Sequence, residues 1–114
     1  MGYVSSVAQS QVQVLSERHA MQRIYGQKNY LMLPVEEAEE GAHVKIIYDN
    51  KIVKEFNVRL AVNKVDYYVP VDISVINGKN ALIDVDFGDG RNRRHSDIKN
   101  YVCWTKIDYT DKID

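Results

Sequence analysis

The clearest pattern along the chain is an alternation of apolar and polar side chains with a period of two. This alternation places every second side chain on the same face of an extended backbone, so each run predicts a half-buried β-strand. The polar positions of these runs, among them Tyr68, Asp84 and Asp86, are expected to face solvent. The apolar positions of the three clearest runs are Phe56, Val58 and Leu60, then Val65, Tyr67, Val69, Val71 and Ile73, then Ala81, Ile83, Val85 and Phe87.

Turn-forming residues separate these runs. Asp49-Asn50 lies between the β-rich runs 44–48 and 52–60, and both residues tolerate a positive φ, which predicts a tight hairpin turn. Asn77-Gly78 predicts another turn before the strand that contains Ala81. Pro70 has no backbone N–H to donate, so its strand is expected at a sheet edge or a bulge.

Weaker patterns predict the rest of the fold. Strands are expected at 30–35 and 101–109, and the first 28 residues favour strand although they also fit a helix face. The glutamates at 36, 37, 39 and 40 predict an acidic loop, and the arginines at 91, 93 and 94 predict a basic one. Short strands with turns about every 8 to 12 residues predict an all-β fold, an antiparallel β-sandwich in a single domain.

The composition agrees with one globular domain and excludes several function classes. The 114 residues are 45% hydrophobic and 27% charged, which is in the globular range. The net charge of −1 provides no field that would attract nucleic acid or an anionic membrane, and no apolar run approaches the ~18 residues of a membrane span. Cys103, the single cysteine, cannot form a disulfide within the chain.

The N-terminal segment has two interpretations. Ala8-Gln9-Ser10 resembles the small-x-small end of a secretion signal, which would make residues 2–10 a signal remnant behind an added Met1. Three such common residues also occur together by chance. The expected division is therefore an N-terminal segment at 1–20, with the candidate remnant and the first strand, and a sandwich domain at 21–114.

The histidines and the cysteine do not form a recognisable reactive set. His19, His43 and His95 are distant in sequence from one another and from Cys103, so they predict ordinary surface or loop histidines. Neither a nucleophile elbow nor a glycine-rich phosphate loop occurs in the sequence. No metal site, cofactor or catalytic residue is therefore expected.

The acidic residues near 84–89 suggest two further kinds of site, a calcium loop and a catalytic carboxylate pair. The pattern of residues favours neither of them. A calcium loop of the EF-hand type that starts at Asp84 would have Gly88, Asp89 and His95 where an oxygen ligand, a glycine and a bidentate Glu are needed. Asp84 and Asp86 could also imitate the carboxylate pair of a glycosidase. A solvated strand face, however, provides no pocket to raise the pKa of either group.

The aromatic residues are the strongest candidates for binding. Eight Tyr, one Trp and two Phe could form a platform on which sugar rings stack, with Tyr68 on the polar face of its strand. Tyr101 and Trp104 fall on opposite faces of the expected last strand, so at least one of them is expected to be exposed. The alternative is that these residues bury their rings and satisfy their polar tips inside the domain.

Several segments together carry a family resemblance. They are Tyr30–Val35, 58–61 (Val-Arg-Leu-Ala), 65–73 (Val-Asp-Tyr-Tyr-Val-Pro-Val-Asp-Ile), Gly78-Lys79 and 103–107 (Cys-Trp-Thr-Lys-Ile) with the Asp-rich tail. In order and spacing, residues 21–114 resemble the small N-terminal domain that precedes the catalytic module in Bacteroides-type levanases and related fructan hydrolases of glycoside hydrolase family 32.

This resemblance implies a β-sandwich accessory domain in an enzyme that cleaves β-fructosyl linkages and is periplasmic, cell-surface or extracellular. The catalytic residues of that family lie in a five-bladed propeller that follows. The family's Trp-Met-Asn-Asp-Pro-Asn-Gly, Arg-Asp-Pro and Glu-Cys motifs are missing here, so no catalytic residue is carried over. The chain is therefore expected to be an excised domain or a truncated product.

The function expected from the resemblance is non-catalytic: the domain packs on, orients or stabilises the catalytic propeller of the same polypeptide. The residues expected to make this contact are Tyr101, Trp104 and Ile107, because they lie closest to the C-terminal junction. One alternative is a carbohydrate-binding module that contacts fructan through Tyr68. A second is a subunit contact through the unpaired edges of an open sandwich, and catalysis by the chain itself is the least supported.

Overall fold

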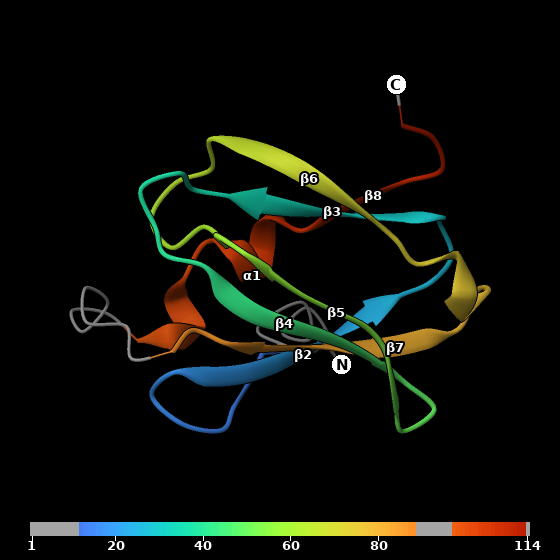
Figure 1. Cartoon of the computed structure of the whole chain (residues 1–114), viewed down its shortest axis with the longest axis horizontal. Coiled ribbons are helices and arrows are strands. Elements are labelled where there is room, and N and C mark those ends of the chain that lie inside the picture. Colours follow the sequence, from blue (N-terminus) through green and yellow to red (C-terminus); the bar gives the residue numbers. More distant parts are fainter. Residues whose placement is uncertain (1–11, 89–96, 114) are drawn as a thin grey trace, which may run out of the picture.

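A computed structural model describes residues 12–88 and 97–113, and all structural statements concern these residues. Two antiparallel sheets pack face to face (Figure 1), which confirms the predicted single-domain β-sandwich. The five-stranded sheet has the order β1-β2-β7-β4-β5, and the three-stranded sheet has the order β6-β3-β8. The strands are β1 (Gln13–Val14), β2 (His19–Tyr25), β3 (Tyr30–Val35), β4 (Ala42–Tyr48), β5 (Lys51–Val58), β6 (Tyr67–Asp72), β7 (Asn80–Asp86) and β8 (Asp108–Thr110).

The predicted turns and the edge proline are confirmed. Asp49 and Asn50, with φ of 56° and 63°, connect β4 to β5 in the tight-turn geometry that the sequence indicates. Asn77 and Gly78, with φ of 53° and 83°, follow the short 3₁₀ turn η2 (Ser74–Ile76) and lead into β7. Pro70 lies on β6, an edge strand of the three-stranded sheet, as expected for a residue that has no backbone N–H to donate.

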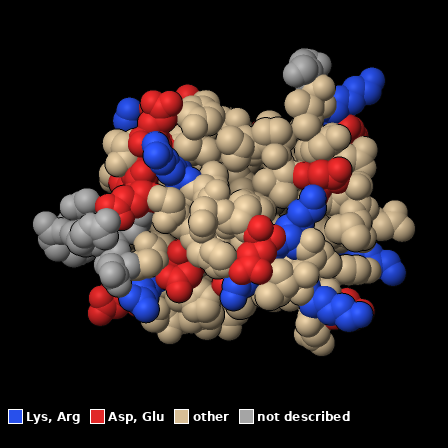
Figure 2. All heavy atoms as spheres, viewed as in Figure 1, with Lys and Arg blue, Asp and Glu red and all other residues tan. Residues whose placement is uncertain are grey.

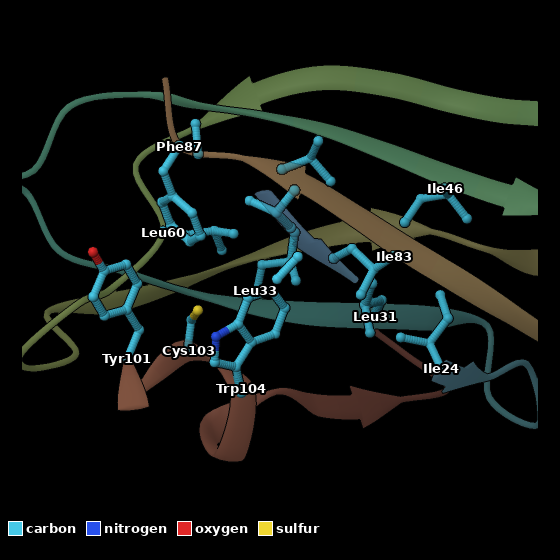
Figure 3. Close-up of a cluster of buried hydrophobic side chains, with 14 of the residues drawn as sticks. Ile24, Leu31, Leu33, Ile46, Leu60, Ile83, Phe87, Tyr101, Cys103 and Trp104 are labelled. Carbon is cyan, nitrogen blue, oxygen red and sulfur yellow. The ribbon is translucent and has the colours of Figure 1, made fainter. Parts of the chain in front are cut away.

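Alternating apolar side chains fill the space between the sheets. Ile24, Ile46 and Ile83 of the five-stranded sheet lie with Leu31 of β3 at one end of the cluster in Figure 3. At the other end the core is closed by aromatic residues near the C-terminus. The completely buried strand residues include Ala20, Ile24, Leu31, Leu33, Ala42, Val44, Ile46, Ile83 and Val85.

The prediction of a strand at 101–109 is wrong for most of that range. The chain instead forms the 3₁₀ turn η3 (Ile98–Asn100) and the one-turn helix α1 (Cys103–Lys106), and only Asp108–Thr110 is strand. Ile98, Tyr101 and Trp104 are all buried, and their spacing of three residues places them on one side of a helical turn rather than one face of a strand. The indole N–H of Trp104 donates to the carbonyl of Ile98 at 2.8 Å and closes this turn.

Two acidic residues expected in solvent are buried. Asp84 is only 8% exposed because β7 is an inner strand, with His19 of β2 on one side and Lys45 of β4 opposite it on the other. Nε2 of His19 lies 2.9 and 3.0 Å from the two carboxylate oxygens of Asp84. Glu36, expected in the acidic loop, is 4% exposed.

Candidate functional site

The surface that best fits a contact role lies where the edge strand β6 meets the segment after α1. Tyr68 is 39% exposed, as expected for the polar face of its strand, and its hydroxyl donates to the carbonyl oxygen of Lys106 at 2.9 Å. Ile107 follows directly and is half-buried. We call Tyr68, Lys106 and Ile107 the C-terminal surface. This hydrogen bond fixes a tyrosine ring and the end of α1 relative to each other.

Tyr101 and Trp104, the other two expected contact residues, point into the domain. Their exposed fractions are 3% and 5%, so the expectation that at least one is exposed is wrong. Both rings meet Phe87 edge to face, at centroid distances of 5.0 Å for Tyr101 and 6.2 Å for Trp104 (Figure 3). In the folded chain these two side chains support the C-terminal surface from inside and do not form it.

Backbone hydrogen bonds hold α1 in place. The N–H groups of Val102 and Cys103 donate to the carbonyls of Val62 and Ala61, at 3.1 and 3.2 Å. The side-chain amide of Gln22 on β2 donates to the carbonyl of Trp104 at 3.2 Å. Because α1 is bonded to both a loop and a strand, Lys106 and Ile107 are held in a fixed position where the chain enters β8.

Glu36 supports the loop on which α1 rests. One carboxylate oxygen accepts the backbone N–H groups of Val62, Asn63 and Lys64, at 3.0, 2.8 and 3.3 Å. Burial alone would raise the pKa of Glu36, but these three donors outweigh burial and lower the pKa. The sequence gives no signal for this role, because Glu36 stands next to three other glutamates within five residues.

A polar cluster lies on the outer face of the five-stranded sheet. Nε2 of His43 is 2.6 Å from a carboxylate oxygen of Glu55, and its Nδ1 is 3.0 Å from the side-chain oxygen of Asn57. The hydrogen bond to Glu55 and then the one to Asn57 raise the pKa of His43, because both ring nitrogens donate only when the imidazole is protonated. His43 is thus a strand residue with defined partners.

The described residues bring together no obvious reactive set. They contain no group of three or more His, Cys, Asp or Glu side chains placed to hold a metal ion. Cys103 is buried in the core, and this burial raises the pKa of its thiol. His95 and Asp89, which belonged to the histidine and calcium-loop candidates, lie outside the described residues, as does the basic loop expected at 91–94.

A groove lies between the two edge strands β5 and β6. It has a volume of about 380 Å³ and is lined mainly by apolar side chains, which are half-buried except for the exposed Pro70. Lys54 and Asp72 are among the lining residues as well. Figure 2 shows an uncharged area in the upper centre of this side of the molecule, with charged side chains around it. The apolar lining residues are Phe56, Val58, Val69, Pro70 and Val71. A groove with this lining suits packing against another chain better than acid–base chemistry.

Comparison with known proteins gives one family. The family model described as "Domain of unknown function (DUF4980)" matches residues 16–114. No curated protein and no solved structure matches the chain. In the part of the chain that the structure describes, the helices are too short to cross a membrane.

Proposed function

The chain belongs to the family described as domain of unknown function DUF4980, and we propose that it is a non-catalytic accessory domain of a secreted, fructan-degrading glycoside hydrolase of the levanase type. In this proposal the domain packs on the catalytic domain of the same polypeptide and orients it. The family is known in sequences of the glycoside hydrolase family 32 type, which supports the proposal. The order of the segments that resemble the N-terminal domains of levanases supports it as well.

The observation that carries the proposal is the rigid attachment of the C-terminal segment. A domain can orient a neighbour only if the connection between them does not swivel. Here α1 is hydrogen-bonded to Ala61 and Val62, and the Tyr68 hydroxyl holds the carbonyl of Lys106. The exposed ring of Tyr68 and the half-buried Ile107 then offer apolar surface beside the end of α1. In the proposed arrangement these two residues contact the catalytic domain.

The test uses the complete polypeptide that contains this domain. Tyr68→Ala is expected to lower the melting temperature of the catalytic domain, because it removes both the ring contact and the bond to Lys106. Tyr67→Ala is the matched control, since Tyr67 is the adjacent residue, is 46% exposed and points to the other face of β6. A polypeptide without a glycoside hydrolase domain would contradict the proposal, and so would equal melting temperatures for the two variants.

A second candidate function is carbohydrate binding through Tyr68. The observation that favours it is that the ring is exposed while its hydroxyl is fixed by Lys106, so a flat apolar face is presented at little entropic cost. The 114-residue chain is then retarded in an electrophoresis gel that contains levan or inulin, and Tyr68→Ala reduces the retardation. Unchanged mobility in both polysaccharides would exclude this function.

A further inference from the structure

The four outermost strands of the sandwich are protected unequally against pairing with another chain. β1 has two residues and β8 three, and β6 contains Pro70, so these three edges offer little or interrupted backbone for pairing. β5 is different. It is one of the two outermost strands of the five-stranded sheet, spans eight residues and contains no proline. Its ladder with β4 is irregular at Val53, but residues 54–58 pair with β4 in regular register. Among the described edge strands, 54–58 is the longest regular run without a proline.

The same edge borders the apolar groove. Phe56 and Val58 of β5 line it and are half-buried, so part of each side chain stays in contact with water. A strand added to the edge of β5 would cover both side chains and pair the free backbone groups. The β5 edge therefore combines the two features that favour addition of a strand.

We propose that β5 pairs with β5 of a second copy of this chain, antiparallel and with the two-fold axis at Phe56. Residues opposite each other in an antiparallel pair have side chains on the same face. An axis at Phe56 places Phe56 opposite its own copy, Glu55 opposite Asn57 and Lys54 opposite Val58. No like charges meet in this register.

The neighbouring symmetric registers are less favourable. An axis at Val53 falls on the residue that has no partner in the ladder with β4. An axis at Lys54 places two lysines opposite each other, and an axis at Glu55 places two glutamates opposite each other. An axis at Asn57 places Glu55 opposite Arg59, so Arg59 would have to be part of the strand. Arg59 has already left β5 at that point, because its carbonyl accepts the N–H of Glu36 at 2.9 Å and the next residue, Leu60, bridges to β3.

The side chains that would meet across the axis are already ordered. His43 holds Glu55 and Asn57 from the outer face of the sheet, so little side-chain freedom is lost when they face a second copy. The net charge of −1 gives only weak repulsion between copies. β5 and the C-terminal surface belong to different sheets, so this inference does not depend on the proposed function.

The test is sedimentation equilibrium of the 114-residue chain from micromolar to millimolar concentration. We expect a monomer–dimer equilibrium. Asn57→Asp keeps an oxygen for His43 but places a carboxylate opposite Glu55 twice per dimer, so the dissociation constant should rise about fivefold. Asn57→Lys places opposite charges there and should lower the dissociation constant. Gln13→Glu makes the same amide-to-carboxylate change on β1, at the far edge of the sheet, and should leave the constant unchanged.

Cysteine pairs test the register itself. Chains with Glu55→Cys mixed with chains with Asn57→Cys should form a disulfide between the two variants under mild oxidation, since directly opposite residues are close enough for this bond. Chains that stay monomeric at millimolar concentration would overturn the proposal. A dimer whose dissociation constant is the same for Asn57→Asp, Asn57→Lys and Gln13→Glu would overturn it as well.

Discussion

The carboxylate of Glu36 accepts the backbone N–H of Asn63 at 2.8 Å, and this contact joins the end of β3 to the loop that carries α1. The same carboxylate oxygen also accepts the N–H groups of Val62 and Lys64. The carbonyl of Val62 in turn accepts the N–H of Val102, at the start of α1. A buried acid thus supports the C-terminal surface through one loop.

Glu36→Gln is expected to lower the free energy of unfolding by about 1–2 kcal/mol. The amide oxygen still accepts hydrogen bonds, but bonds from N–H groups to a neutral acceptor are weaker than bonds to a carboxylate. Urea unfolding, followed by the fluorescence of the single tryptophan, Trp104, measures the difference. Glu37→Gln is the control, because Glu37 is exposed and its loss should change the free energy by less than about 0.5 kcal/mol. Equal effects of the two variants would show that the buried carboxylate carries no special role.

The contribution of Glu36 to stability depends on pH with a defined sign. Its pKa in the fold lies below the ordinary value of 4.5, so the unfolded chain takes up a proton at a higher pH than the folded chain does. The stabilisation is complete above the ordinary pKa and is lost as pH falls through the folded pKa. The difference in free energy between wild type and Glu36→Gln should therefore shrink as pH is lowered from 7 toward 3. A difference that stays constant over this range would contradict the lowered pKa.

Gly26→Ala is expected to destabilise the fold by about 1–3 kcal/mol through overpacking. A Cβ at this position would lie 2.5 Å from Cγ2 of Ile76 and 2.7 Å from the carbonyl oxygen of Lys79. Gly41→Ala is the matched control, since the nearest atom to its Cβ would be 3.9 Å away. Thermal unfolding of both variants by circular dichroism makes the comparison. Similar melting temperatures for the two would show that the η2 turn shifts freely to admit a methyl group.

The pKa of His43 should fall when Glu55 is replaced by Gln. The largest cause of the raised pKa is the hydrogen bond from His43 to Glu55, followed by the one to Asn57. Because the folded pKa is raised, protonated His43 favours the fold at pH below the ordinary value of 6.5, and this contribution disappears as pH rises through the folded pKa. NMR titration of the imidazole protons measures the pKa directly. The same titration of Glu40→Gln should reproduce wild type, whereas an unchanged pKa in Glu55→Gln would mean that the bond to Glu55 does not form in solution.

The strands were predictable where one face of a sheet is exposed to solvent and the other face is buried. Alternation at 81–87 and the Asp49-Asn50 turn located β7 and the β4–β5 hairpin, since both signals are local. The burial of Asp84 was not predictable from its own strand, because it depends on His19, 65 residues away in sequence. The same holds for Glu36, whose partners come from a distant loop.

The candidate site was predicted only in part. Tyr68 is exposed as expected, but Tyr101 and Trp104 were assigned to a strand and are buried in a helical segment. A run of nine residues with aromatic, polar and small side chains fits both periods, and packing against Phe87 decides between them. The sequence therefore did not reveal that Tyr101 and Trp104 are buried while Tyr68 is exposed.

The central claim is that a catalytic domain of the same polypeptide packs on the C-terminal surface of this domain. Amide hydrogen exchange, compared between the complete polypeptide and the 114-residue chain at a concentration where both are monomeric, tests it most directly. The account predicts slower exchange at 67–69 and 106–107 in the complete polypeptide, with no change at the β2 strand on the opposite sheet. Identical exchange of 67–69 and 106–107 in the two proteins would contradict it.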